Sequence, residues 1–187
     1  MGALQAWSST ERPEAFNLPE TLTRLRDPDP DAPDDPELRG LYHRDQEDRR
    51  DNQLADGAVE RDILRRRRGM EKLAAGEVRS PWDYYHLAML LQHSGLPEHY
   101  HLAHELCRRA APHCPRAPWL AAAALDRWLL HMGLPQRFGT QYVRSGGRWS
   151  LYRVDPSTTD EERTTWDVPT LAEAHHQAEK MNHSENR

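Results

Sequence analysis

The chain has 187 residues, of which 37% are hydrophobic and 29% are charged, and its formal net charge at pH 7 is −5. This length suffices for the core of one domain without disulfide bonds, and the low apolar share predicts that part of the chain does not fold. The negative charge provides no broad basic surface for phosphate groups, which excludes general nucleic-acid binding from the expected functions.

No apolar run approaches the roughly 20 residues that a membrane-spanning helix needs. The start MGALQAWSST lacks the basic and apolar regions of a secretory signal. We therefore expect a cytoplasmic protein without a membrane partner. Cys107 and Cys114 are too few for a disulfide framework, and a reducing cytoplasm would keep both as thiols.

The first 36 residues are predicted to form a disordered, acidic, proline-rich arm. Residues 27–37 read DPDPDAPDDPE, in which like charges repel and each proline disfavours helix in its predecessor. A single helical domain is expected from residue 37 to residue 181, followed by a frayed tail at 182–187.

Two helices are predicted in the first part of this domain. Residues 37–50 carry Leu38, Leu41, Tyr42 and Asp45 on one face. Residues 58–75 form the second helix, whose apolar stripe consists of Val59, Ile63, Met70, Leu73 and Ala74. The run Arg65–Arg68 on this helix is interpreted as a solvated face that pairs with nearby acidic residues.

The clearest local signal is Ser80-Pro81-Trp82-Asp83, an N-cap serine with a proline at the first helical position and a carboxylate at the third. It predicts the first of three antiparallel helices, which end near residues 95, 111 and 133. An aromatic and β-branched hairpin follows at about 138–154, and short helices are expected at 160–166 and 170–181. The fold class is therefore mainly α, a helical bundle with a small antiparallel β-hairpin near the C-terminus.

Asp126 stands out in the third of these helices, which is apolar nearly all round. On a helical wheel its carboxylate points between apolar side chains and away from Arg127. A buried carboxylate needs a partner, or its pKa shifts until it is neutral. Two interpretations stay open: a structural one, an ion pair or backbone cap that orients the following loop, and a functional one, a general acid or base or a ligand anchor.

Gln92 and His93 end the helix that starts at residue 81. Imidazole beside a carboxylate is a common acid–base pair, so His93 and Asp126 are the candidate catalytic residues. The alternative for His93 is a helix cap or a surface position. Gln92 and Arg127 are candidate substrate-binding residues, with Arg127 suited to an anionic group.

Gln136, Thr140 and Gln141 surround Gly139 at the start of the hairpin. They fit ordinary turn chemistry, and they also fit an amide-lined wall that would bind a polar ligand, so all three are candidate substrate-binding residues.

Seven histidines and cysteines lie between residues 93 and 114, but their spacing matches no zinc motif. We assign no metal site on this basis. The alternative is a site formed by His93, His104 and Asp126 across three helices. The sequence identifies no cofactor.

Several blocks together resemble a bacterial domain family of unknown function, which is marked by its DR and Q-x-F/Y-G-T-Q blocks. They are DQEDR (45–49), RD (61–62), DYYHLAMLLQH (83–93), AHEL (103–106), WLAAAALDR (119–127), PQRFGTQ (135–141) and DEER (160–163). The resemblance covers roughly residues 37–181 and implies a shared polar set without a reaction. That set is Gln92, His93, His104, Asp126, Arg127, Gln136, Gly139, Thr140 and Gln141.

Two functions compete on these observations. The first is a small enzyme, of a biosynthetic or tailoring pathway, with a pocket for a small polar molecule between the three helices and residues 136–141. The second is a protein-binding adaptor, because the alanine-rich helices loosely resemble a tetratricopeptide pair and the acidic arm suits a basic partner.

Overall fold

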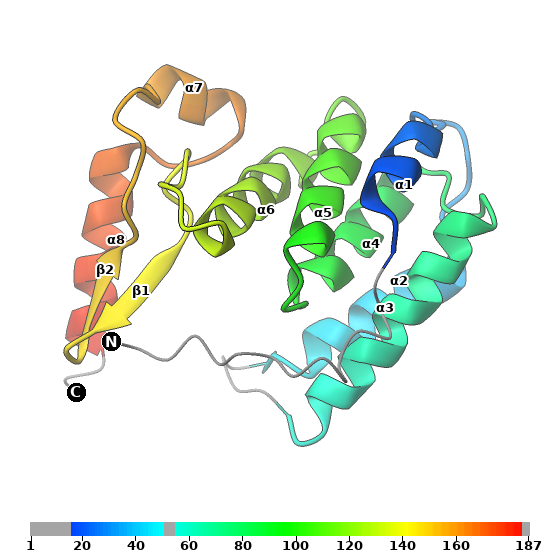
Figure 1. The fold of residues 1–187 in the computed structure, drawn as a ribbon, viewed down its shortest axis with the longest axis horizontal. Coiled ribbons are helices and arrows are strands. Elements are labelled where there is room, and N and C mark those ends of the chain that lie inside the picture. Colours follow the sequence, from blue (N-terminus) through cyan, green and yellow to red (C-terminus); the bar gives the residue numbers. More distant parts are fainter. Residues whose placement is uncertain (1–15, 51–54, 185–187) are drawn as a thin grey trace.

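The computed structural model describes residues 16–50 and 55–184, which contain eight helices and one two-stranded antiparallel sheet (Figure 1). They are α1 (Leu18–Arg24), α2 (Pro36–Glu47), α3 (Ala58–Ala74), α4 (Pro81–Gln92), α5 (Pro97–Ala110), α6 (Ala117–His131), β1 (Tyr142–Ser145), β2 (Arg148–Leu151), α7 (Asp160–Thr165) and α8 (Leu171–Ser184). The predicted class, mainly α with a small hairpin near the C-terminus, is confirmed.

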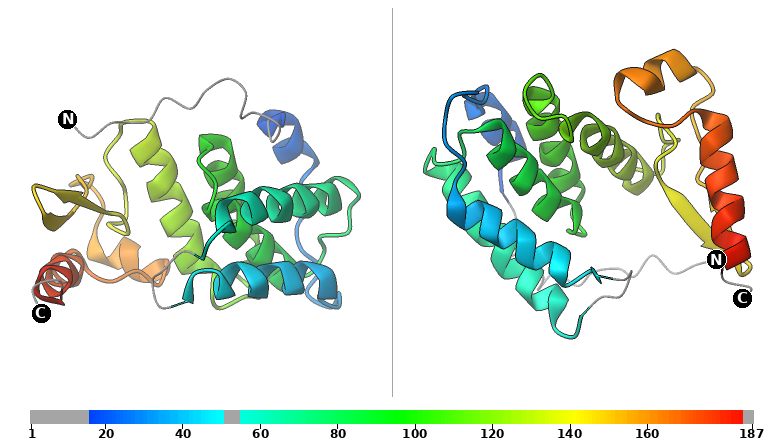
Figure 2. Two further views of the ribbon diagram at one scale, coloured as in Figure 1. Left: turned by 90° about the horizontal axis from the view of Figure 1, so that it is seen from below. Right: turned by 180° about the vertical axis from the view of Figure 1, so that it is seen from behind.

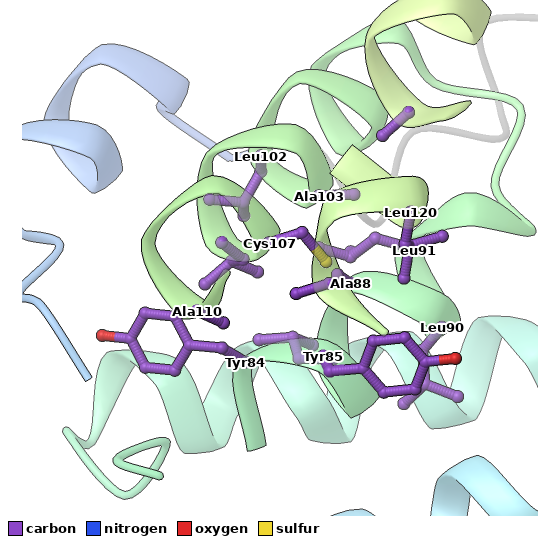
Figure 3. Packing of buried hydrophobic residues seen from close by; sticks show 14 of the residues in the cluster. Tyr84, Tyr85, Ala88, Leu90, Leu91, Leu102, Ala103, Cys107, Ala110 and Leu120 are labelled. Atoms are coloured by element: carbon purple, nitrogen blue, oxygen red, sulfur yellow. The ribbon is translucent and has the colours of Figure 1, made fainter. Parts of the chain in front are cut away.

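Helices α4, α5 and α6 form the centre of the fold, and α2 and α3 pack against α4. Their contact buries one apolar cluster in which Leu91, Leu102, Leu106 and Cys107 are fully inaccessible (Figure 3). The N-terminus of α4 has the predicted capping box, because the Ser80 hydroxyl accepts from the Asp83 amide and the Asp83 carboxylate accepts from the Ser80 amide, both at 3.0 Å.

The described part of the expected arm, residues 16–36, lies against the central helices. Helix α1 contacts α5, and the Tyr84 hydroxyl donates to the main-chain oxygen of Arg26 at 2.7 Å. The Ser80 hydroxyl likewise donates to the Asp34 carboxylate at 2.7 Å. Prolines thus prevent a continuous helix here, while Tyr84 of α4 and the N-cap Ser80 hydrogen-bond to this segment. Residues 1–15 of the expected arm lie outside the described residues.

Helix α3 differs in part from its predicted pattern: Met70 and Leu73 of the expected stripe pack against the core, but much of the buried face is charged. Val59 of the expected apolar stripe is 52% exposed, whereas Asp62, Arg65, Arg66 and Lys72 are buried. These residues recur at helical spacing on the side that faces α2 and α4, where acidic side chains meet them. The interpretation of Arg65–Arg68 as a solvated face therefore holds only for Arg67 and Arg68.

The hairpin, α7 and α8 lie beyond the C-terminal half of α6, away from α2 and α3 (Figure 2). The hairpin turns through Gly146 and Gly147, whose φ angles of 57° and 80° suit a two-residue turn with both central residues left-handed. Helix α8 packs on β2 and extends to Ser184, and the Asn182 side chain hydrogen-bonds both main-chain groups of Trp149. The final turn of α8 thus includes residues 182–184, which we expected to fray.

Gly69 marks the closest approach of α3 to α4. A Cβ atom at this position would lie 2.6 Å from Cδ1 of Leu87, which is itself fully buried. We expect Gly69→Ala to lower the free energy of unfolding by about 1–3 kcal/mol, because the packed core must shift. Gly40→Ala on α2 is the matched control, since its Cβ would meet only the flexible end of Arg44 at 3.4 Å. Urea unfolding of both variants measures the effect, and equal stabilities would contradict this packing.

His86 and His99 are buried, and desolvation lowers the pKa of each to about 4. In the unfolded chain a histidine titrates near pH 6.5, so between pH 6.5 and 4 the unfolded state binds more protons and stability falls as the pH falls. We expect each histidine to lower the free energy of unfolding by roughly 1–2 kcal/mol when the pH falls from 7 to 5.

Urea unfolding at pH 7 and pH 5 tests this expectation. The rings of His86 and Tyr42 have centroids 4.7 Å apart, and His86→Phe keeps a ring at this position. Because phenylalanine cannot bind a proton, this variant should lose less stability between pH 7 and pH 5 than the wild type does. His175→Gln, at an exposed position of α8, should retain the full loss. A His86→Phe variant with the wild-type pH dependence would contradict the assignment.

Candidate functional site

Asp126 holds the loop that connects α6 to β1. Its side chain is fully buried and accepts hydrogen bonds from the amides of Arg137, Phe138 and Thr140 at 2.7, 2.9 and 3.0 Å, and from the Thr140 hydroxyl at 2.8 Å. Burial raises the pKa of Asp126, although these hydrogen bonds oppose the shift. Of the two open interpretations, this geometry matches the cap that orients the following loop.

Gln136 fastens the same loop to the end of the hairpin. Its buried carboxamide donates to the main-chain oxygens of Gln141 and Tyr152 at 3.0 and 2.8 Å and accepts from the Gln141 amide at 2.8 Å. The intervening Gly139 has a φ of 87°, which a residue with a side chain rarely adopts. The polar residues of the PQRFGTQ block therefore build the loop, and Gln141 alone directs its side chain to an arginine of α6, as described next.

The C-terminal end of α4 brings together several of the other predicted residues. Arg127 of α6 donates from Nη1 to the main-chain oxygen of Gln92 at 2.6 Å, and from Nε to the Gln141 side chain at 3.2 Å. Arg66 of α3 donates to the main-chain oxygen of His93 at 3.0 Å. Two guanidinium groups thus satisfy carbonyls that end the helix, where the helix dipole favours positive charge.

The side chain of His93 pairs with Asp45 of α2 and not with Asp126. Nδ1 of His93 lies 2.9 Å from the Asp45 carboxylate, and the side chains are 20% and 1% exposed, respectively. An ionised carboxylate only accepts hydrogen bonds, so this contact favours the tautomer with the proton on Nδ1, in which Nε2 of a neutral imidazole keeps its lone pair. We expected His93 and Asp126 to form one acid–base pair, and in the structure each has its own partners.

A network of charges lies behind Asp45. Arg49 donates to Asp45 at 2.9 Å and also pairs with Asp62, which accepts from Arg65 at 3.0 Å. Arg65 and Arg61 in turn bind Asp48, at 2.6 and 2.8 Å. Hydrogen bonds from Arg61 and Arg65 hold the pKa of Asp48 well below its usual range. The network thus connects the blocks DQEDR (45–49) and RD (61–62) to His93, the last residue of the block at 83–93.

Asp45 was not among the predicted site residues, although its place on an apolar helix face pointed to it. Asp45 shares a helical face with Leu38, Leu41 and Tyr42, all of which are buried. A carboxylate on an apolar face is the signal that singled out Asp126. Its partner could not be identified, because His93 is 48 residues away in the sequence.

His104 does not approach His93 or Asp126 as the alternative metal site required. Its Nδ1 lies 2.9 Å from the main-chain oxygen of Ala121. Within residues 16–50 and 55–184, no group of three or more histidine, cysteine, aspartate or glutamate side chains is arranged to hold a metal ion.

A groove of about 810 Å³ lies between α1 and the C-terminal half of α3, with Leu25, Met70 and Tyr84 among its lining residues. The predicted site residues do not line it. This groove is therefore not the pocket that we expected between the three central helices and residues 136–141.

Comparisons with protein-family models, with curated proteins and with solved structures found no match. The resemblance to a family of unknown function therefore stays a prediction from the sequence blocks. None of the helices in the described part of the chain has the length and apolarity that a membrane span requires.

We expect Asp126→Asn to lower the free energy of unfolding by about 1–3 kcal/mol, because an amide presents one acceptor and an unwanted donor to the backbone amides of the loop. A catalytic Asp126 would instead tolerate this change with an unaltered melting temperature. Asp31→Asn, at an exposed position, is the control. Urea unfolding distinguishes the two roles, and equal stabilities of wild type and Asp126→Asn would refute the structural one.

Proposed function

We propose that this protein is an enzyme in which His93 acts as a general base, oriented by Asp45, on a small polar substrate bound at the C-terminal end of α4. The contact of 2.9 Å between Nδ1 of His93 and the buried Asp45 carboxylate is the observation that carries the proposal. This Asp45–His93 pair replaces the Asp126–His93 pair that the sequence suggested.

The chemistry follows from the two ring nitrogens. With Nδ1 bonded to Asp45, Nε2 is the atom that accepts a proton from a substrate hydroxyl, an amine or a water molecule. The imidazolium that forms would be stabilised by Asp45, while Arg49 and Gln46 hold that carboxylate in place at 2.9 and 2.8 Å. The side chain of His93 is 20% exposed, so part of it is open to solvent. General bases of this kind contribute about 10²–10⁴-fold to a rate.

A protein-binding adaptor is the second candidate. Its support is the set of exposed apolar side chains, which are Val59, Leu64, Trp119, Met132 and Leu134. They come from α3, α6 and the loop after α6, whereas an adaptor surface needs one contiguous patch.

A cytoplasmic location is also part of the proposal, and the two free thiols Cys107 and Cys114 are consistent with it.

Nitrogen-15 NMR of the histidine rings tests the orientation of His93 without knowledge of the substrate. We expect the neutral ring to carry its proton on Nδ1, and we expect Asp45→Ala to shift the population toward the Nε2-protonated form. The exposed His175 should not respond to that substitution. A wild-type His93 with its proton on Nε2 would contradict the proposal.

Turnover is tested by incubating the wild-type protein with a bacterial metabolite extract and identifying depleted compounds by mass spectrometry. His93→Gln should slow the depletion by about 10²–10⁴-fold, as expected for loss of a general base. His175→Gln is the matched control and should retain the wild-type rate. Depletion by His93→Gln at the wild-type rate would exclude His93 as the base.

A further inference from the structure

We propose that Arg127 binds an oxyanion, a carboxylate or a phosphate, on the substrate of the His93 site. This inference rests on the proposed function and names the chemical class of its substrate. It is carried by two features of the C-terminal end of α4: among the described residues, Arg127 has no carboxylate partner, and the buried carboxamide of Gln92 has no hydrogen bond.

Arg127 differs from other cations that the fold removes from solvent. Arg65 pairs with Asp48 and Asp62, and Lys72 pairs with Asp35 and Glu77 at 2.8 Å each. Arg163 pairs with Asp160 at 3.0 Å. Arg127 is half-buried and forms no ion pair with any carboxylate of residues 16–50 or 55–184. A desolvated charge without a counter-ion is costly, so this position favours an incoming anion.

The guanidinium of Arg127 is also held in a fixed orientation. Nη1 donates to the Gln92 main-chain oxygen, Nε donates to the Gln141 side chain, and the group lies 5.8 Å from the centroid of the Tyr100 ring. In the described part of the chain, Nη2 donates to no acceptor. A planar guanidinium with one nitrogen left over is suited to an oxyanion, because little side-chain entropy remains to be lost on binding.

The carboxamide of Gln92 is the second feature. The residue is only 3% exposed, and neither its nitrogen nor its oxygen has a hydrogen-bond partner among the described residues. Buried polar atoms are rarely left in this state. A hydroxyl or amide group of a ligand could supply both the donor and the acceptor that this carboxamide lacks.

The position of Arg127 relative to the base supports the same substrate class. Arg127 binds the main-chain oxygen of Gln92, and the next residue in the chain is His93. Arg66 adds a second positive charge at the adjacent main-chain oxygen. An anion on Arg127 would therefore lie at the same end of α4 as His93, whose ring contacts Asp45.

The test is an NMR titration of the full-length protein with sodium phosphate and, separately, with sodium acetate, at constant ionic strength set by sodium chloride. We expect saturable shifts of the Arg127 Nε–H and Gln141 side-chain signals with at least one anion. Saturation by phosphate alone indicates a phosphorylated substrate, and saturation by acetate alone indicates a carboxylic acid. No saturable shift with either anion would overturn the proposal.

Arg127→Gln should raise the Kd of the bound anion at least tenfold. Arg153→Gln is the matched control, because this exposed arginine also donates to a main-chain oxygen, that of Gly133 at 2.9 Å, and should leave the Kd unchanged. An unchanged Kd in Arg127→Gln would also overturn the proposal.

Gln141→Glu keeps the test decisive if Arg127→Gln does not fold. The change is nearly isosteric and places a carboxylate at the position that now lies 3.2 Å from Nε of Arg127. It should abolish anion binding in a folded protein, and retained binding would contradict the assignment. His93→Gln should bind the anion as the wild type does, so anion binding and base catalysis can fail separately.

Discussion

The end of helix α4 is the constraint on which the surrounding arrangement depends. A helix that ends inside a protein leaves carbonyl groups without intrahelical partners, and each must be satisfied by another group. Here Arg66 from α3 and Arg127 from α6 donate to the main-chain oxygens of His93 and Gln92. Because Gln141 also contacts Arg127, the loop after α6 is joined to the same point. One requirement of backbone chemistry thus gathers three helices and a loop around His93.

The contact of α2 with α3 solves a second problem, which is how to bury a charged surface. Asp45 and Asp62 are 1% and 5% exposed, and each accepts from Arg49. A buried pair of this kind adds little net stability over an apolar contact, but removing one partner leaves an uncompensated charge. These ion pairs therefore fix the positions of the Asp45 and Asp62 side chains more than they add to the stability of the fold. That geometry fixes the carboxylate to which the His93 ring is bonded.

The elements that the sequence predicted well are those whose signals are local. The capping box joins Ser80 to Asp83, three positions apart, and the hairpin expected at about 138–154 turns through the adjacent residues Gly146 and Gly147. The buried face of α3 was misjudged, because Arg65 is buried against Asp48 and Asp62, and Arg66 donates to the main-chain oxygen of His93. Periodicity identifies which side chains share a face, but it does not identify what that face will meet.

The candidate site was predictable to the same extent. Asp126 and Asp45 are both buried carboxylates on largely apolar helix faces, and the sequence could recognise their burial but not their partners. The partners separate their roles. Asp126 accepts from three backbone amides and a hydroxyl, which do not titrate near neutral pH, so its surroundings keep a loop in place. Asp45 instead contacts the imidazole of His93, whose side chain is partly exposed. Asp45 therefore contacts a ring that can serve as a base, as proposed for His93, whereas Asp126 contacts only the loop that follows α6.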